Sequence, residues 1–182
     1  AAGEIAGWFQ GRFEWGPRAL GARSILADPR SAETRERVNR AIKFREPFRP
    51  FAPAVRDEDA ARYFEIGERA DHLAPYMLTV MPVRAEARAL LPAITHVDGT
   101  ARVQRVPKDD APGLHRLLGA FEEESGVGVL LNTSMNLKDE PLVASPAEAY
   151  ALLLRSALDF LVIEGCIVER PRALRGGIGR AA

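Results

Sequence analysis

Four short stretches of the sequence combine residue types that suit the binding of an anion. The first, residues 11–24, holds three glycines, the arginines Arg12, Arg18 and Arg23, and Glu14. Glycine lets the backbone approach a ligand closely, and a guanidinium group donates paired hydrogen bonds to phosphate or carboxylate oxygens. Glu14 could orient one of these arginines. The stretch lacks the Gly-Lys-Ser/Thr of a Walker A loop, so it predicts either another kind of anion site or a surface turn with solvated arginines.

The second stretch, residues 43–51, alternates cations with phenylalanines. Its cations are Lys43, Arg45 and Arg49, and two prolines stiffen the backbone between them. Cations held in this way lose less freedom when a ligand binds, which favours a preorganised anion site. Two alternatives remain, because the phenylalanines could stack on nucleic-acid bases or belong to the core.

The third stretch, residues 95–102, contains a histidine and one more arginine. His96 stands two residues before Asp98 and could act as an acid or base, although a lone histidine often has a structural role. Arg102 is a further candidate for contact with an anion.

The fourth stretch, residues 132–136, follows an apolar run at 127–131 that predicts a buried strand. Ligands of open α/β sheets bind at the carboxyl ends of strands, which is where this stretch is expected to lie as a turn. Asn132, Ser134 and Asn136 could donate hydrogen bonds to phosphate oxygens or to a carboxamide. Ser134 lacks the Gly-x-Ser-x-Gly setting of a hydrolytic nucleophile.

The charge balance favours a small anionic ligand over a long polyanion. The 182 residues include 25 basic and 25 acidic ones, so the formal net charge is zero and a globally basic nucleic-acid binder is disfavoured. Residues 12–49 nevertheless hold ten basic residues against five acidic ones. This local excess fits a phosphate or carboxylate ligand.

Several classes of protein are disfavoured by composition. The single cysteine, Cys166, cannot form an internal disulfide or a multi-thiolate metal site, and the three histidines are scattered, so we expect no metal site made by side chains. No apolar run approaches the ~20 residues that span a bilayer. We therefore expect a cytoplasmic protein without a membrane segment.

Residue patterns predict one α/β domain over residues 1–170, with a twisted mixed sheet flanked by helices, and an Arg/Gly-rich tail at 171–182. Strands are expected at 4–10, 51–55, 76–83, 100–106, 127–131 and 159–168. Helices are expected at 32–42, 84–91, 112–124 and 146–157, with one or two helical turns at 57–64.

Together, the four stretches resemble the carboxyl-terminal domain of the O-carbamoyltransferases of nodulation and antibiotic biosynthesis. The resemblance rests on residues 14–21, 43–53, 95–104 and 132–136, which occur in the same order, and it covers nearly the whole chain. In that family the domain is YrdC-like, and the Lys43-x-Arg45 and Ser134-x-Asn136 pairs resemble the signature of YrdC-type nucleotide-binding proteins. Met135, Gly128 and Trp15 depart from the residues usual in the family.

The resemblance implies ATP-dependent activation of carbamoyl phosphate to carbamoyl adenylate, with Mg²⁺ bound to the nucleotide. An upstream domain with an actin-like fold and an iron site then passes the carbamoyl group to a hydroxyl acceptor. Because that domain is absent from this sequence, we expect the chain to be part of a longer biosynthetic transferase. A homodimer is compatible with this interpretation.

The resemblance also assigns the site. It implies that Arg18, Lys43 and Arg102 are the catalytic cations. Arg49, Asn132 and Ser134 would line the same pocket, and Arg23, Arg45, His96 and Asn136 are further candidates for substrate or nucleotide binding. The alternative function is a non-catalytic YrdC-like module that binds a nucleotide or RNA, although nucleic acid is the less favoured partner.

Overall fold

The computed structural model describes residues 3–43, 49–67 and 72–171. Arg45 and the expected tail from residue 172 onward lie outside these ranges.

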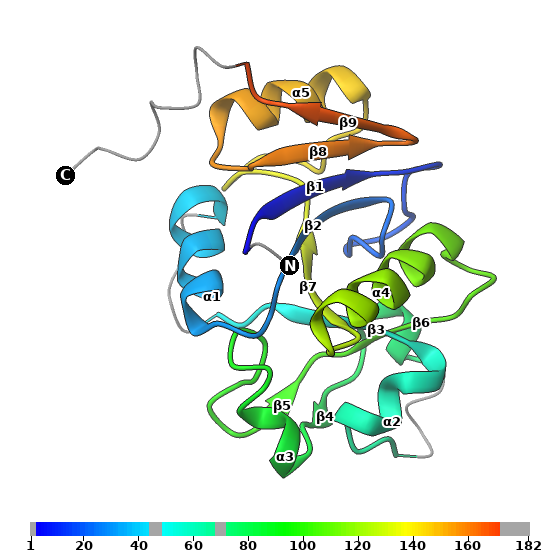
Figure 1. Ribbon diagram of the computed structural model, residues 1–182. Coiled ribbons are helices and arrows are strands. Elements are labelled where there is room, and N and C mark those ends of the chain that lie inside the picture. Colours follow the sequence, from blue (N-terminus) through cyan, green and yellow to red (C-terminus); the bar gives the residue numbers. More distant parts are fainter. Residues whose placement is uncertain (1–2, 44–48, 68–71, 172–182) are drawn as a thin grey trace.

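A twisted seven-stranded sheet forms the centre of the molecule (Figure 1). In spatial order its strands are β6 (Gln104–Val106), β3 (Ala52–Arg56), β7 (Val129–Ser134), β2 (Arg23–Ala27), β1 (Ile5–Phe9), β8 (Phe160–Ile163) and β9 (Cys166–Glu169). The β3–β6 and β1–β8 pairs are parallel and the other neighbours are antiparallel. A second, two-stranded sheet pairs β4 (Met81–Pro82) with β5 (Thr100–Ala101). The predicted α/β fold with a mixed sheet is confirmed.

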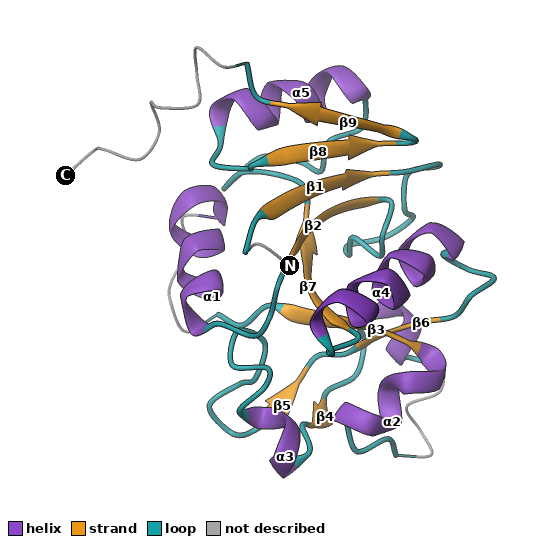
Figure 2. Ribbon diagram, viewed as in Figure 1, coloured by secondary structure: helices purple, strands orange, loops and turns teal. Residues whose placement is uncertain are grey.

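Helices cover both faces of the large sheet (Figure 2). Helix α4 (Pro112–Ser125) packs Leu114 and Leu118 against β3 and β7. Helices α1 (Ala32–Val38) and α5 (Pro146–Arg155) contribute to the larger core on the opposite face. Short helical segments are η1 (Asn39–Lys43), η2 (Asp57–Asp59), α2 (Ala60–Tyr63), η4 (Ala74–Tyr76) and α3 (Ala85–Arg88).

The helix boundaries follow local signals in the sequence. Ser145 accepts a hydrogen bond from the backbone N–H of Glu148, whose carboxylate accepts from the N–H of Ala144 at 2.7 Å. Helix α4 ends at Gly126, whose φ of 75° suits glycine. Helix α1 passes directly into the π-helical turn η1, whose last residue is Lys43.

Strand boundaries were harder to predict than helix boundaries. Strand β2 was missed because all five of its residues are buried, so no alternation marks it. Strand β7 continues through Ser134, so Asn132 and Ser134 lie on the strand rather than in a turn after it. The strand expected at 159–168 is a hairpin, β8 and β9, that turns at Glu164 and Gly165.

Two further predicted strands are wrong in extent. Residues 76–83 contain only the two-residue β4, because the chain begins there in a 3₁₀ turn and Met77 takes a left-handed conformation with φ 54°. The strand expected at 100–106 is interrupted at Arg102 and Val103. As a result β5 joins the small sheet, β6 joins the large one, and Arg102 lies at the junction between them.

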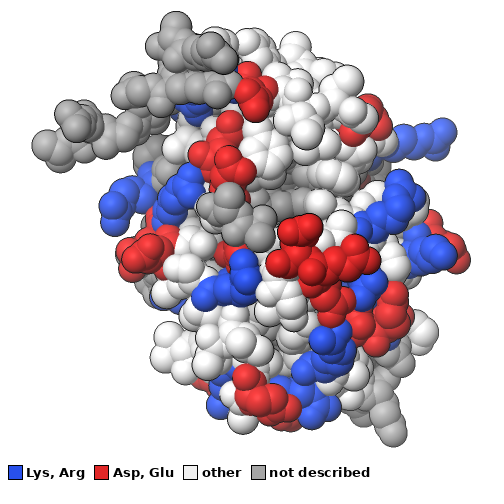
Figure 3. Space-filling model, in the orientation of Figure 1, with Lys and Arg blue, Asp and Glu red and all other residues white. Residues whose placement is uncertain are grey.

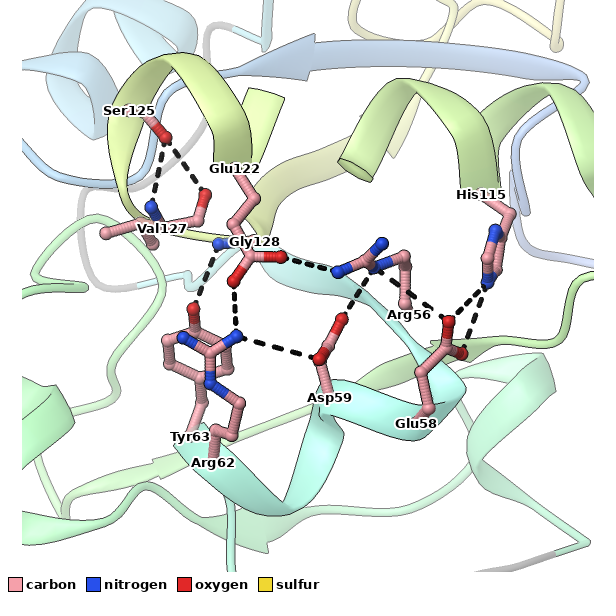
Figure 4. A network of polar contacts seen from close by, with 10 residues as sticks. All are labelled: Arg56, Glu58, Asp59, Arg62, Tyr63, His115, Glu122, Ser125, Val127 and Gly128. Atoms are coloured by element: carbon pink, nitrogen blue, oxygen red, sulfur yellow. Dashed lines mark hydrogen bonds and ion pairs between the residues drawn. The ribbon is translucent and has the colours of Figure 1, made fainter. Parts of the chain in front are cut away.

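A network of charged side chains fastens η2 and α2 to helix α4 (Figure 4). Glu122 on α4 accepts hydrogen bonds from Arg56, at 2.5 Å, and from Arg62. Asp59 accepts from Arg56 at 2.6 Å on the other side. The Glu122 side chain is 18% exposed, so we expect the contribution of these ion pairs to stability to lie between those of exposed and of buried pairs.

Glu122→Gln is expected to lower the free energy of unfolding by about 1–3 kcal/mol, because two guanidinium groups lose a charged partner in a partly desolvated place. Urea denaturation measures this change. The matched control is Glu123→Gln, since Glu123 is exposed on the same helix, and we expect it to change stability by less than about 0.5 kcal/mol. Equal effects of the two substitutions would contradict the structural role of the network.

Candidate functional site

Lys43 forms the centre of a polar cage at the carboxyl end of β7. Its ammonium group is buried, and its three N–H donors are shared among four oxygens of two residues. The acceptors are the carbonyl and hydroxyl oxygens of Ser134, at 2.5 and 3.1 Å, and the carbonyl and Oδ1 of Asn136, at 3.0 and 2.7 Å. Ser134 donates its hydroxyl proton to Asn136 Oδ1 at 2.6 Å. The cage fixes a positive charge at this edge of the sheet.

A cavity of about 220 Å³ opens beside this cage. It is lined by Lys43, Arg49, Ser134, Asn136, Leu137, Lys138 and Asp139. Arg49 reaches it because the segment before β3 runs alongside the carboxyl end of the antiparallel β7. Three cations and a single carboxylate line the cavity, so its charge favours an anionic ligand.

Arg102 interacts electrostatically with Arg49, which lines this cavity, and with Arg18. Burial lowers the pKa of Arg102, and the like charges of Arg18 and Arg49 lower it further. The Nε atoms of Arg18 and Arg102 are buried and find no acceptor within residues 3–43, 49–67 and 72–171. Arginine stays protonated even so. Desolvation of Arg102 and the like charges near it cost free energy, which an anion beside Arg102 would offset.

The charge of Arg102 reaches the ring of His96, and the surroundings of this ring favour its neutral form. Burial lowers its pKa, Asp98 opposes the change, and the charge of Arg102 adds to it. The Nδ1 atom of the ring is 3.0 Å from the hydroxyl of Thr100. The Nε2 atom is buried and has no partner among the side chains and backbone groups that the structure describes.

The loop that carries Arg18 is held from within by Glu14. One carboxylate oxygen, Oε1, accepts from the backbone N–H groups of Leu20, Ala22 and Arg23 at 2.8, 2.7 and 3.0 Å. Glu14 was expected to orient an arginine side chain, but these contacts show that it mainly organises the backbone of the loop.

A pair of buried amides holds the same loop from the sheet. Asn132 on β7 donates to Gln104 Oε1 at 2.7 Å and to the carbonyl of Ala19 at 3.3 Å. Gln104 on β6 donates to the carbonyl of Leu20 at 2.7 Å. Because Ala19 follows Arg18 directly, this pair fixes the backbone from which the arginine extends. The Oδ1 atom of Asn132 is buried and has no donor in the described part of the chain.

Asn132→Ala is expected to lower the free energy of unfolding by about 1–2 kcal/mol, because Gln104 Oε1 loses its donor. It should also weaken the binding of inorganic phosphate several-fold, since the Arg18 loop is no longer held. Urea denaturation and calorimetry measure the two effects separately. A loss of stability with unchanged phosphate affinity would show that the amide pair has no part in positioning the site.

Among the described residues, the side chain of Arg23 contacts the loop after β1 and Phe9, and none of the other candidate site residues. Its guanidinium group donates to the carbonyls of Gln10, Ala22 and Gly11 at 2.9, 2.9 and 3.1 Å, and it lies 3.5 Å from the centre of the Phe9 ring. It therefore shapes the loop after β1. Arg45 lies outside the described residues.

The remaining eight candidates form one connected region. Lys43, Ser134 and Asn136 share hydrogen bonds, Arg49 lines the same cavity, Arg102 interacts with Arg49, Arg18 and His96, and Asn132 supports the Arg18 loop. Sequence reasoning missed the part played by Gln104. Its signal was a polar residue at a core-facing position between Val103 and Val106, where it is 2% exposed.

Residues 3–43, 49–67 and 72–171 bring together no group of three or more His, Cys, Asp or Glu side chains that could hold a metal ion. None of their helices has the length and apolar character needed to cross a membrane.

Comparison with known proteins gives consistent matches. Residues 1–170 match the family described as "Carbamoyltransferase C-terminus". The chain is 45% identical to the nodulation protein NolO of Bradyrhizobium diazoefficiens, covering 100% of this chain and 33% of that protein. It is 49% identical to the 3'-hydroxymethylcephem-O-carbamoyltransferase of Amycolatopsis lactamdurans, covering 79% of this chain and 26% of that enzyme.

A solved structure supports the fold. The crystal structure of HypF from T. kodakarensis matches with a TM-score of 0.51 and 17% sequence identity, over 93% of this chain and 22% of that one. The chain thus spans only 25–33% of the length of the first curated relatives that it matches.

Proposed function

Because the chain belongs to the carbamoyltransferase C-terminus family, we propose that it performs the activation half of an ATP-dependent O-carbamoyl transfer. In this proposal carbamoyl phosphate and ATP yield carbamoyl adenylate at the cationic region described above. The observation that carries it is the cavity that Lys43 and Arg49 line, together with Arg102, on which the charges of Arg49 and Arg18 both act.

Atom balance defines the chemistry that the site must support. Carbamoyl adenylate contains only a carbamoyl group and AMP, so phosphate must leave carbamoyl phosphate and pyrophosphate must leave ATP. One water molecule cleaves carbamoyl phosphate to phosphate and carbamate. A carbamate oxygen then attacks the α-phosphorus of ATP as the bond to pyrophosphate breaks. Both steps release phosphate-bearing groups whose negative charge the site has to stabilise.

The cations offer two contributions to these steps. Two phosphate-bearing substrates repel each other, and fixed positive charges offset that repulsion when the substrates come together. The same charges stabilise the developing charge on the leaving groups. Lys43, held rigidly by four oxygens, suits this task because it need not reorganise during the reaction. Asp139 is the single carboxylate of the 220 Å³ cavity, so we expect Mg²⁺ to bind mainly through the triphosphate of ATP.

Transfer to a hydroxyl acceptor belongs to the rest of the proposed enzyme. The chain covers about a third or less of the related transferases, so the acceptor site and the upstream actin-like domain stay part of the proposal. The alternative is a module that binds a nucleotide or RNA without turnover. On the face drawn in Figure 3, acidic side chains lie among the basic ones, which does not favour a polyanion.

The deciding experiment is ATP–pyrophosphate exchange on this chain with Mg²⁺, with and without carbamoyl phosphate. Exchange that depends on carbamoyl phosphate would support adenylate formation by this chain alone. Calorimetric binding of carbamoyl phosphate without exchange would mean that the site is present and needs the rest of the enzyme. If the chain shows no exchange and does not bind carbamoyl phosphate, the proposal is overturned in favour of the binding module.

A further inference from the structure

We propose that His96 recognises the amino group of carbamoyl phosphate, with Nε2 of its ring accepting a hydrogen bond from the carbamoyl N–H. This inference rests on the proposed function and deepens it, because it names the side chain that distinguishes a carbamoyl phosphate from other acyl phosphates. His96 is thus a specificity-determining residue.

The hydrogen bonds around His96 determine which ring nitrogen carries the proton. The Thr100 hydroxyl lies 2.7 Å from Asp98 Oδ1, and a carboxylate can only accept, so this hydroxyl must donate its single proton to Asp98. The oxygen of Thr100 is then an acceptor for His96 Nδ1, at 3.0 Å. The proton of the neutral ring therefore sits on Nδ1, and Nε2 presents a lone pair.

The charge state of the ring supports the same assignment. Burial and the neighbouring Arg102 both lower the pKa of His96 against the opposing effect of Asp98. The ring is consequently neutral near pH 7. An imidazolium would carry a second N–H and could not accept a hydrogen bond at Nε2.

The position of this lone pair restricts the ligand. The phosphate group of an acyl phosphate is fully ionised near neutral pH, so all its oxygens are acceptors and none of them can satisfy Nε2. The described residues give Nε2 no donor, although burying an acceptor without one costs free energy. Arg102, close enough to influence the ring, prefers an anion. The geometry therefore points to a ligand that carries an N–H donor next to a phosphate, as carbamoyl phosphate does.

In this proposal different side chains recognise the phosphate and the acyl substituent. The charges of Arg18 and Arg102 act on each other, and the phosphate binds beside them. The charge of Arg102 also reaches the His96 ring, so the acyl substituent of a phosphate bound at Arg102 is tested by His96.

The test compares three ligands by calorimetry: carbamoyl phosphate, acetyl phosphate and inorganic phosphate. Acetyl phosphate has a methyl group in place of the amino group, so it lacks the N–H donor. We expect the chain to bind carbamoyl phosphate more tightly than acetyl phosphate by roughly 10-fold or more, as for one polar group that a site is built to pair. His96→Leu should abolish this preference and leave the affinity for inorganic phosphate unchanged.

Two further variants separate recognition from a structural role. His96→Gln supplies an acceptor oxygen and should restore part of the preference. Thr100→Val keeps the histidine but removes the acceptor for Nδ1–H, so the ring can exchange tautomers and the preference should fall. Neither change should affect the binding of inorganic phosphate.

The outcomes are distinguishable from a failure of the proposed function. If the unaltered chain does not bind carbamoyl phosphate, the proposed function and this inference both fail. If it binds carbamoyl phosphate but His96→Leu weakens all three ligands equally, His96 is structural and only the inference fails. If His96→Leu weakens ATP while the preference between the acyl phosphates persists, His96 contacts the nucleotide and the inference is likewise overturned.

Discussion

Arg102→Met is expected to reduce carbamoyl-phosphate-dependent activity by at least roughly 30-fold, or ~2 kcal/mol of transition-state stabilisation, without destabilising the protein. The loss follows from the position of Arg102, which interacts with both Arg18 and Arg49. A residue between two other cations contributes to the field at any anion that they share. Methionine keeps much of the length of the side chain but removes its charge and its donors.

The stability of Arg102→Met is the sharper part of this prediction. Burial and the like charges of Arg18 and Arg49 all disfavour the charged form of Arg102, which lowers its pKa. Removing the charge relieves this unfavourable interaction, so the melting temperature without ligand should stay the same or rise. Added inorganic phosphate should raise the melting temperature of the unaltered chain and have little effect on the variant. Loss of activity with gain of stability is the signature expected of a functional cation.

Two control variants test whether the effect depends on the kind of cation at residue 102 and on its position in the molecule. Arg102→Lys keeps the charge but not the planar fork, so we expect intermediate activity. Arg116→Met removes an exposed arginine on α4 and should leave phosphate binding unchanged. If Arg102→Met proved markedly less stable while still binding phosphate normally, Arg102 would be a structural residue and the proposed anion site would be wrong.

Local signals predicted the helices better than they predicted the strands. Ser145 begins α5 and Gly126 ends α4 through contacts within a few residues, so their patterns can be read directly. Strand β2 depends on distant partners on both sides, β1 and β7. The interruption at Arg102 likewise arises because its two flanking segments pair with different sheets. Such non-local choices leave little trace in a short window of sequence.

The same distinction explains what was predicted about the site. Residue type and motif spacing selected Lys43, Ser134 and Asn136, which the structure joins by direct hydrogen bonds. They could not separate Arg18 from Arg23, because both are arginines of one Gly-rich stretch. The difference is tertiary: three backbone carbonyls accept hydrogen bonds from the terminal nitrogens of Arg23, whereas Arg18 contributes its charge beside Arg102.

Lys43→Met is expected to affect both stability and function. The substitution leaves four oxygens of Ser134 and Asn136 without the ammonium group that they share. An acceptor that loses its donor costs about 1–3 kcal/mol when it is buried. Ser134 and Asn136 are partly buried, so water reduces the sum, and we expect the free energy of unfolding to fall by about 2–4 kcal/mol. Urea denaturation followed by near-ultraviolet circular dichroism measures this change.

The effect of Lys43 on function is tested with a second variant that retains the lysine and most of its acceptors. Ser134→Ala removes one acceptor, at 3.1 Å, and retains the Ser134 carbonyl and both Asn136 oxygens around the ammonium group. It should remain folded, lose less stability than Lys43→Met, and keep most of the phosphate affinity. Lys43→Met, at a temperature where it is folded, should bind phosphate at least roughly 10-fold more weakly, since a rigidly held charge is gone.

Comparison of the two variants separates the possible roles of Lys43. If Lys43→Met is folded and still catalyses exchange at the normal rate, the lysine only joins η1 to β7, and the activation chemistry must depend on the arginines alone. If Lys43→Met does not fold, Ser134→Ala decides. In Ser134→Ala the ammonium group can shift within a weakened cage. Expressed as free energies, the loss in exchange rate should then exceed the loss in stability. Catalysis depends on the position of the charge, whereas folding depends mainly on its being paired.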